Sequence, residues 1–454
     1  MSTASTTAST PTPPKKGGLS DIRKVFGGGQ SSLRQFGILG SLLVIIVIFQ
    51  IWTGGLTLSP TNLINVVNQY SYILILAIGM VMVIIMGHID LSVGSVAAFT
   101  GIIVAKSMAE WNLPWPLAIV LGIAVGAAIG AWQGFWVAFV GVPAFIVTLA
   151  GMLIFRGGNQ FIGQSTTTPV PQEFGVIGAG YLPELAVPLN FNVLTMLLGL
   201  AGAGWIVWNE FHLRRVQKKM GSEQAPVWVS VVKVIVLAGV ILWAAWLFAT
   251  GRPGTSFPIS GIILVVLVIV YSFITNNTIF GRHIYAVGGN RLAATLSGVK
   301  DRRVDFFVMM NMSVLAALAG MIFVARSTAS GPQDGNGWEL DAIAAVFIGG
   351  AAVSGGIGTV IGSIVGGLVM AFLNNGLQLI GAGADVVQII KGLVLLLAVA
   401  VDVWSKRSGG ASIIGLWSNR RKARLESEGP TAPPTVAPVA ASNESSQPSD
   451  LQPR

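Results

Sequence analysis

Residues 62–86 decide the fold class: they read NLINVVNQYSYILILAIGMVMVIIM and include no charged side chain. A helix needs about 20 apolar residues to cross the hydrocarbon core of a bilayer, so this stretch is long enough to span a membrane. Stretches of the same kind lie near 36–57, 91–109, 115–139, 190–208, 227–250, 257–276, 304–325, 357–379 and 384–403. The sequence therefore predicts an all-α polytopic membrane protein.

The composition of the whole chain agrees with this prediction. Among 454 residues, 53% are hydrophobic and only 10% are charged, whereas a soluble domain carries about 25% charged residues. So small a polar fraction excludes a soluble enzyme, and the absence of Cys excludes disulfide frameworks and thiolate metal sites. The net charge of +9 comes from basic clusters between apolar runs, which is typical of membrane orientation. We expect no metal site and no nucleic-acid partner.

The two ends of the chain differ from its centre. Residues 1–34 and 406–454 are rich in Pro, Ser and Thr, and the second segment begins with a basic cluster. Segments of this composition cannot bury enough apolar surface to fold alone. We expect two disordered cytoplasmic tails around a transmembrane domain over residues 35–405.

Two apolar stretches, 143–156 and 339–351, are too short for a comfortable crossing. Short or broken segments are tolerated where protein or a water-filled cavity surrounds them, so both indicate a pathway. Basic clusters at 15–34, 214–219, 282–303 and 406–424 mark the cytoplasmic side. All four clusters share that side only if both short stretches cross, which predicts about 10–12 transmembrane helices, two of them short or broken. The sequence leaves open whether 339–351 crosses or re-enters.

Asp90 is a rare ionised side chain within the apolar region, and it lies in the junction 87–95 (GHIDLSVGS) between two predicted helices. Its charge would stabilise the start of the following helix, which Ser92 and Ser95 could cap. Direct contact with a transported substrate is the alternative. His88 could titrate near neutral pH, but a lone His is more often a hydrogen-bonded neighbour than a proton relay.

Glycine supplies 57 residues, nearly twice its usual share of about 7%, and is concentrated in the predicted membrane segments. Small residues let helix backbones approach closely in lipid. The run from Gly349 to Gly367 therefore indicates either tight packing of a helix hairpin or a moving interface.

The sequence holds no recognisable means of powering transport. A phosphate-binding loop needs Gly-x-x-x-x-Gly-Lys-[Ser/Thr], and the nearest match, Lys106-Ser107, follows Ala105 instead of Gly. The paired carboxylates and Arg-rich helices of proton pumps and voltage sensors are also missing. We expect a transporter component that is not an enzyme, with its energy supplied by another subunit.

The third basic cluster offers a docking place for that subunit. Residues 280–303 begin FGRHIYAVGGNRLAATLSGV, a predicted cytoplasmic loop with a Gly-Gly-Asn turn before a helix-favouring stretch. A short helix can lie in a groove of a partner and transmit movement as a rigid lever. The ordered small and polar residues are Gly281, Gly288, Gly289, Asn290, Ala293, Ala294, Ser297 and Gly298.

This loop resembles the coupling loop of the permease subunits of bacterial ABC importers for monosaccharides, the ribose, xylose and arabinose group of a larger family that includes branched-chain amino acid permeases. Ala293-Ala294, three residues and Gly298 are similar to the importers' Glu-Ala-Ala-x-x-x-Gly motif, with Leu292 at the usual Glu position. Residues 87–95, 142–157 and 339–376 resemble the same family in the same order. The resemblance covers about residues 36 to 404.

The resemblance implies alternating access in the bacterial cytoplasmic membrane. Two copies of the chain would form the pore, a cytoplasmic ATPase would hydrolyse ATP, and an extracytoplasmic binding protein would deliver a monosaccharide; the chain itself would bind no cofactor. An extra hydrophobic pair at 190–250 is similar to the xylose or multiple-sugar type. Candidate pathway residues, for each of which helix packing is the alternative role, are Asp90, Ser92, Phe145, Thr148, Asn374 and Asn375.

Other functions stay open at this point. An ion-gradient-driven secondary sugar transporter would need no ATPase, although its expected intramembrane carboxylates are mostly absent. An ABC permease could also carry another small solute, such as a branched-chain amino acid or a nucleoside. A membrane scaffold or enzyme would need a polar catalytic cluster, for which the sequence offers only Asp90 with His88.

Overall fold

The computed structural model describes residues 30–185, 190–221, 227–252 and 254–407. Of the two expected tails, only residues 30–34 and 406–407 fall among them, and these are helical. The remainder of both tails lies outside the described residues. The described residues up to Asp402 group into one compact unit, and residues 403–407, the end of one helix, belong to another.

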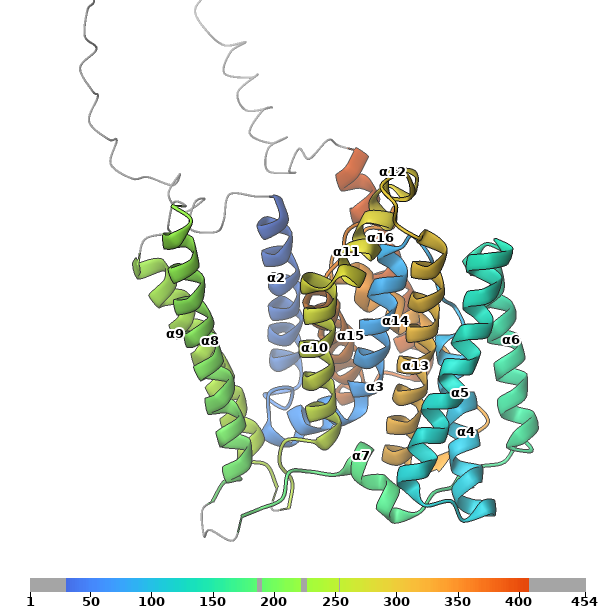
Figure 1. Cartoon of the computed structure of the whole chain (residues 1–454). Helices are drawn as coiled ribbons and strands as arrows, with labels where there is room; N and C mark the ends of the chain where they lie inside the picture. The colour runs from blue at the N-terminus through green and yellow to red at the C-terminus, as the bar shows by residue number, and fades with distance from the viewer. Residues whose placement is uncertain (1–29, 186–189, 222–226, 253, 408–454) are drawn as a thin grey trace, which may run out of the picture. The chain divides into compact units, whose positions relative to one another are not determined.

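Helices make up most of the described chain (Figure 1). They are α2 (Gln30–Trp52), α3 (Pro60–Ile85), α4 (Val93–Trp111), α5 (Trp115–Phe135) with its π-helical continuation η1 (Trp136–Val140), α6 (Ala144–Ile162), the 3-10 turn η2 (Gln172–Gly175), α7 (Val176–Ala179), α8 (Val193–Lys219), α9 (Val227–Ala249), α10 (Ile259–Asn277), α11 (Ile279–Gly289), α12 (Arg291–Leu296), α13 (Asp301–Ser327), α14 (Trp338–Ile348), α15 (Val360–Leu379) and α16 (Ala384–Arg407). Two short strands, β1 (Thr168–Pro169) and β2 (Ala329–Ser330), pair antiparallel.

The prediction of an all-α polytopic membrane protein is confirmed. Within the described ranges, nine helices are long and apolar enough to cross a bilayer: α3, α4, α5 with η1, α6, α8, α9, α10, α13 and α15. Helix α2 adds a shorter apolar stretch, Gly37–Trp52. In hydrocarbon every backbone polar group must find its partner within the protein, and a helix satisfies this requirement inside one segment.

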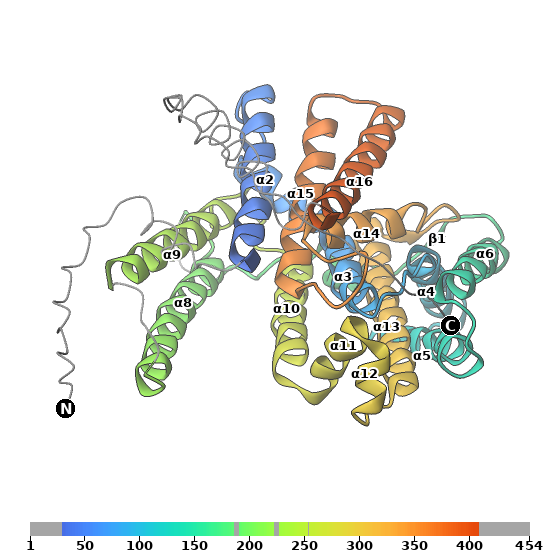
Figure 2. The same ribbon diagram turned by 90° about the horizontal axis from the view of Figure 1, so that it is seen from above.

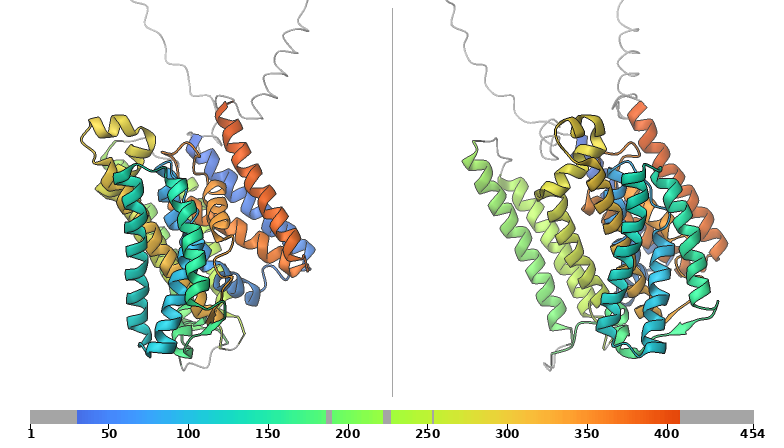
Figure 3. Two further views of the ribbon diagram at one scale, coloured as in Figure 1. Left: turned by 90° about the vertical axis from the view of Figure 1, so that its right-hand side faces the viewer. Right: turned by 45° about the vertical axis from the view of Figure 1, so that its right-hand side comes forward.

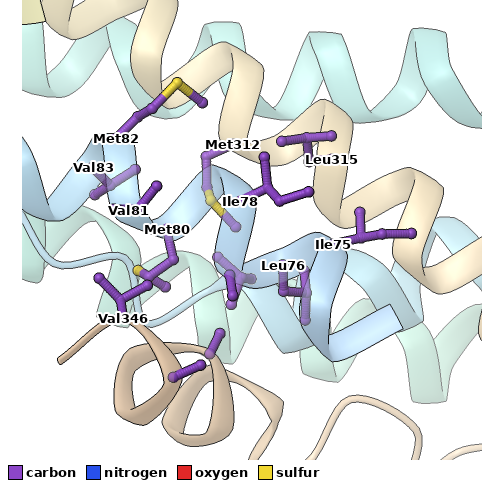
Figure 4. Close-up of a cluster of buried hydrophobic side chains, with 14 of the residues drawn as sticks. Ile75, Leu76, Ile78, Met80, Val81, Met82, Val83, Met312, Leu315 and Val346 are labelled. Atoms are coloured by element: carbon purple, nitrogen blue, oxygen red, sulfur yellow. The ribbon is translucent and has the colours of Figure 1, made fainter. Parts of the chain in front are cut away.

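Helix α3 lies in the middle of the bundle, with α10, α13, α14 and α15 around it (Figure 2). Ser59 caps its start, because the Asn62 N–H donates to the Ser59 hydroxyl over 3.4 Å, and Pro60 occupies the first turn, where no intrahelical donor is needed. In Figure 4 the apolar side chains of α3 pack against Met312 of α13 and Val346 of α14. Because lipid is as apolar as these side chains, close packing holds this core together rather than exclusion of water.

Glycines bring α14 and α15 together at backbone distance. A Cβ at Gly349 would collide with the Gly362 carbonyl, and a Cβ at Gly366 would collide with the Ala345 carbonyl. Contacts of this kind are how small residues join helices in membranes. The glycine run therefore serves tight packing in this structure, and a moving interface stays a prediction.

The stretch 143–156 is longer than the sequence indicated. It belongs to α6, Ala144–Ile162, which is long enough to cross a bilayer. The sequence predicts a segment that ends at Arg156, because Pro, Gly and charge flank the apolar stretch. Instead the Arg156 guanidinium lies 3.7 Å from the Glu339 carboxylate of α14, so a protein partner accompanies the charge and the helix continues.

The stretch 339–351 is short, as predicted. Helix α14 has 11 residues and is followed by irregular chain up to α15. The chain leaves the Ser327 end of α13 through β2, and α14 begins inside the bundle, where Glu339 lies beside Gly94 at the start of α4. The irregular chain after α14 reaches the opposite end of α13, near α11, since the Tyr285 hydroxyl of α11 donates to the Gly358 carbonyl over 2.8 Å. The chain from β2 to α15 therefore runs from one end of the bundle to the other.

The extra hydrophobic pair forms a hairpin of α8 and α9 at the side of the bundle (Figures 1 and 3). Asn192 caps α8 by accepting from the Thr195 N–H over 2.9 Å, and the Glu210 carboxylate binds the Lys233 ammonium of α9 over 2.9 Å. Only 17% and 6% of the two membrane windows are buried. Most of the hairpin surface is therefore free to face lipid or another protein.

Candidate functional site

Helices α11 and α12 project from one end of the bundle (Figure 3). Thr278 caps α11, and Asn290 ends α11 while capping α12, where its side-chain Oδ1 accepts from the Ala293 N–H over 3.0 Å. Each short helix is therefore fixed by a side chain at its start. The side chains of Leu292 and Leu296 on α12 are 71% and 81% exposed, so this apolar face is not covered by the part of the chain that the structure describes.

The predicted docking residues fall into two groups, one exposed and the other buried or partly buried. Gly289, Asn290, Ala293, Ser297 and Gly298 are exposed. Gly281 and Ala294 are buried and Gly288 is partly buried, so these three position the helices instead of offering contact atoms. The sequence reasoning treated Leu292 as a departure from a motif and passed over Leu296, although a leucine pair four apart on a short helix is itself a sign of an apolar face.

The end of α11 is joined to α3 through backbone contacts. A Cβ at Gly288 would collide with the Ile85 carbonyl at the end of α3. The same carbonyl accepts a hydrogen bond from the Gly356 N–H over 2.8 Å. Three segments that are distant in the sequence therefore meet without intervening side chains. A displacement of α11 has to move the end of α3 and the chain before α15.

Two cavities beside α11 and α12 are lined by cations. One has a volume of about 320 Å³, the other about 430 Å³, and both are lined by Gly298, Lys300 and Arg303. The first also contacts His283 and the second Arg302. Among the described residues no ion pair involves Lys300, Arg302 or Arg303. This surface therefore favours an acidic partner.

Arg291, the first residue of α12, binds two carboxylates of α13. Its Nη1 and Nη2 donate to Asp305 Oδ2 and Oδ1 over 2.6 and 2.9 Å, and Nη1 also donates to Asp301 over 3.1 Å. The hydrogen bonds with Asp305 raise the pKa of Arg291 above its ordinary value, so the guanidinium stays charged. His88 Nε2 lies 2.9 Å from Asp305 Oδ1. The sequence reasoning missed this cluster, although Asp305 falls inside a predicted membrane segment, where a carboxylate is unusual.

Asp90 organises the start of α4. Its Oδ1 accepts from the Ser92 N–H over 2.8 Å and from the Ser92 hydroxyl over 2.6 Å, and the Gln133 amide of α5 donates to that hydroxyl over 2.8 Å. The Ser92 hydroxyl therefore does not cap the helix, contrary to our expectation, because it donates to the carboxylate. Burial raises the pKa of Asp90, which lies between two membrane helices, to about 6.

The structure brings only some of the predicted pathway residues together. Thr148 of α6 is buried and its hydroxyl donates to the Ile89 carbonyl over 3.2 Å, beside Asp90 and Ser92. Phe145, one turn earlier on α6, is 54% exposed and faces away from the bundle. Asp90, Ser92 and Thr148 therefore meet at the chain that joins α3 to α4, and Phe145 does not contribute to this group.

Asn374 and Asn375 lie elsewhere. The Asn375 and Asn62 side chains exchange two hydrogen bonds, of 2.8 and 3.0 Å, between α15 and the start of α3. The start of α3 is the opposite end of that helix from the Asp90 junction. Both asparagines of α15 are buried, at 2% and 4% exposure. Asn375 makes a packing contact, whereas Asn374 Oδ1 has no hydrogen-bond partner among the described residues, so a pathway role for either one stays a prediction.

Two carboxylates lie at the start of α14, close to the start of α4. Glu339 and Asp341 lie in the first turn of α14, where carboxylates stabilise a helix. Asp341 also binds the Lys391 ammonium of α16 over 2.9 Å. A Cβ at Gly94 would collide with the Gly335 carbonyl, so the start of α4 abuts the chain that leads into α14. The two helix starts thus meet inside the bundle.

The fold combines membrane helices with two short helices at one end and a broken segment before α15. The sequence also matches a known protein family over most of its length. Residues 62–399 match the family described as the branched-chain amino acid transport system permease component. The chain belongs to this family. It is therefore a permease component, and the spans described above make it a multi-pass membrane protein.

Sugar permeases are among its relatives. The xylose transport system permease protein XylH of Haemophilus influenzae is 39% identical over 83% of this chain and 98% of the relative. XylH of Escherichia coli is 37% identical over 87% of this chain and 96% of the relative. The ribose import permease protein RbsC of Escherichia coli is 34% identical over 80% and 92%, respectively. No solved structure gives a significant match.

Proposed function

We propose that this chain is the membrane-spanning subunit of an ABC importer that moves a monosaccharide, xylose or a related sugar, across the bacterial cytoplasmic membrane. The observation that carries the proposal is the pair α11–α12, which projects an apolar face and is joined to α3 by backbone contact. A driving subunit needs such an element in order to push on the bundle. The names of the relatives supply the substrate class.

The energy source in this proposal is a cytoplasmic ATPase seated on α11 and α12. Leu292 and Leu296 would fill an apolar pocket of the ATPase, and the cations around the adjoining cavities would face acidic residues at its rim. ATP would bind to that subunit, and the permease would hold no cofactor and no nucleotide site of its own. Both tails would be cytoplasmic, on the side of α11 and α12, where the basic clusters gather.

The sugar would enter from an extracytoplasmic binding protein at the β1–β2 end of the bundle. Two copies of the chain would enclose the pathway, which fits the outward apolar face of α6 around Phe145. Asp90, Ser92 and Thr148 would form the polar constriction beside it, because they converge on the junction between α3 and α4. A tight sugar site is not needed here, since the binding protein would supply recognition.

The test is purification with the native ATPase and binding protein, followed by uptake of labelled sugar into proteoliposomes. The variant Leu292→Ser/Leu296→Ser removes the apolar face of α12, and Leu292→Met/Leu296→Met is the matched control. Burial of one such side chain contributes about 1.5–3 kcal/mol, so the serine variant should bind the ATPase about 100-fold or more weakly. Uptake should fall with binding, and the methionine variant should retain both.

The same vesicles test the substrate class. Xylose, ribose, leucine and a nucleoside are offered separately with ATP inside or outside. Uptake of xylose or ribose that requires ATP on the α11–α12 side supports the proposal. Transport of leucine or the nucleoside alone would move the assignment to another solute. Sugar uptake without the ATPase that collapses under an uncoupler would establish a secondary transporter instead.

A further inference from the structure

Arg291 is placed to link the docking element with the interior of the bundle. It is the first residue of α12, and both of its terminal nitrogens bind Asp305 of α13, at 2.6 and 2.9 Å. Two parallel bonds between a guanidinium and a carboxylate fix both distance and orientation, which a single bond or a lysine cannot do. The Asp305 side chain is only 4% exposed and the Arg291 side chain 40% exposed, so the pair joins the surface at α12 to the interior of the bundle.

His88 extends the link from α12 to the chain that joins α3 and α4. Its Nε2 lies 2.9 Å from Asp305 Oδ1 and 3.3 Å from Arg291 Nη2, so one ring nitrogen contacts both charged groups. His88 is two residues before Asp90. A shift of α12 would therefore act on the same junction that orders the start of α4.

The junction has its own connections to the helices deeper in the bundle. Asp90 accepts both hydrogen bonds from Ser92, Ser92 accepts from Gln133 of α5, and the Thr148 hydroxyl of α6 donates to Ile89. The chain of contacts is therefore continuous: α12, Arg291, Asp305 with His88, the junction, and then α4, α5 and α6. Continuous packing alone does not establish energetic coupling, which has to be measured.

We propose that Arg291, Asp305 and His88 are positioning residues that transmit movement of α12 to residues 86–92, the chain that joins α3 to α4. The inference rests on the proposed function, because it needs a driving subunit on α11 and α12. The triad contacts neither ATP nor sugar. Its role is to keep hydrolysis in the ATPase coupled to the rearrangement around Asp90. Loss of the triad should leave an assembled complex that hydrolyses ATP with less sugar moved.

The experiment measures sugar moved per ATP hydrolysed in proteoliposomes of the full complex. The variants are Arg291→Gln, Arg291→Lys, Asp305→Asn and the double variant R291Q/D305N. Arg214→Gln is the matched control, because Arg214 also accompanies a carboxylate, Glu210, but lies in the α8–α9 hairpin outside the link. Allosteric coupling energies correspond to about 5- to 150-fold effects, so Arg291→Gln should lower the ratio at least about fivefold.

The other variants sharpen the test. Arg291→Lys keeps the charge without the two-pronged geometry and should fall between wild type and Arg291→Gln. The double variant should be no worse than the more impaired single variant, because both single changes break one contact. The control should keep the wild-type ratio. An unchanged ratio in assembled Arg291→Gln and Asp305→Asn complexes would overturn the proposal.

A direct readout of the junction separates transmission from a merely structural role. The chain has no Cys, so Ile89→Cys can carry a single environment-sensitive fluorophore attached before assembly. ATP binding should change its signal in the wild-type background and leave it unchanged with Arg291→Gln. A full signal change in the variant would refute transmission through this contact.

Failure of assembly is also informative. If Arg291→Gln does not assemble, His88→Gln, which leaves the Arg291–Asp305 pair in place, is measured instead; it should lower both the ratio and the signal, and wild-type values would refute the link. If the wild-type chain itself never binds an ATPase, the proposed function fails rather than the triad. The two failures are thus distinguishable.

Discussion

Two adjacent glycines of α11 offer a sharp test of how the docking element is attached. Alanine at Gly288 would place a Cβ against the Ile85 carbonyl and 3.0 Å from the Gly356 nitrogen, and both neighbours are backbone atoms that cannot rotate away. Alanine at Gly289 would meet no atom within 4 Å. The two substitutions are chemically identical, so their difference reports the contact with α3.

The expected size follows from the structure. Overpacking costs about 1–3 kcal/mol, and loss of the Gly356 N–H bond to Ile85 adds about 0.5–1.5 kcal/mol. Alanine recovers up to about 1 kcal/mol of helix propensity at either glycine. Gly288→Ala should therefore lower the free energy of unfolding by about 0.5–4.5 kcal/mol, whereas Gly289→Ala should leave it unchanged or raised by up to about 1 kcal/mol.

The measurement is thermal or denaturant unfolding of the purified chain in one detergent, with the wild type and both variants side by side. Uptake in the reconstituted importer is measured on the same preparations and should fall for Gly288→Ala alone. Equal stability and equal uptake of the two variants would refute the close backbone contact and the rigid attachment argued from it.

Three further changes test neighbouring parts of the argument. Gly289→Trp should leave unfolding unchanged but weaken ATPase capture in a pull-down, because the added side chain points into open space on the docking surface. Asn375→Ala should lower the free energy of unfolding in detergent by about 1–2 kcal/mol and leave sugar selectivity unchanged. A double-mutant cycle with Asn62→Ala should give a coupling energy of about 0.6–1.7 kcal/mol. A changed sugar selectivity would instead support a pathway role for Asn375. Lys391→Met leaves Asp341 buried and unpaired, so unfolding should become easier by about 2–4 kcal/mol, and the change Asp341→Leu in that background should recover part of the loss.

The sequence predicts the membrane helices well because the physical requirement is local. Each crossing needs enough apolar residues and satisfies its own backbone hydrogen bonds, so segment length alone located α3, α10 and the α8–α9 pair. Helix α6 shows where the local criterion fails. The charge of Arg156 predicts the end of a helix, yet Glu339 of α14 pairs with it. No residue close to Arg156 in the sequence reveals that partner.

The candidate site was predicted in part, for the same reason. The short helix after Asn290 is a local feature, and it is present as α12. The residues before it, expected as a loop with a Gly-Gly-Asn turn, instead form the helix α11, which includes both glycines. Which residues of α11 and α12 face outward depends on the packing of α3 and α13. The sequence therefore predicts buried Ala294 and exposed Gly289 alike as docking residues. The pairing of Asn375 with Asn62 spans most of the chain and has no local signature.

Two kinds of contact attach the docking element, and they constrain different movements. The contact of Gly288 with Ile85 involves backbone atoms and no flexible side chain, so a translation of α11 moves the end of α3 with it. The fork between Arg291 and Asp305 resists rotation of α12 about its own axis, since rotation would break one of two parallel bonds. A push on either helix therefore reaches residues 85–92 in a defined direction. That segment is also where polar contacts hold the start of α4 against α5 and α6. In the proposed importer the force from ATP hydrolysis therefore arrives at a junction that contacts all three helices.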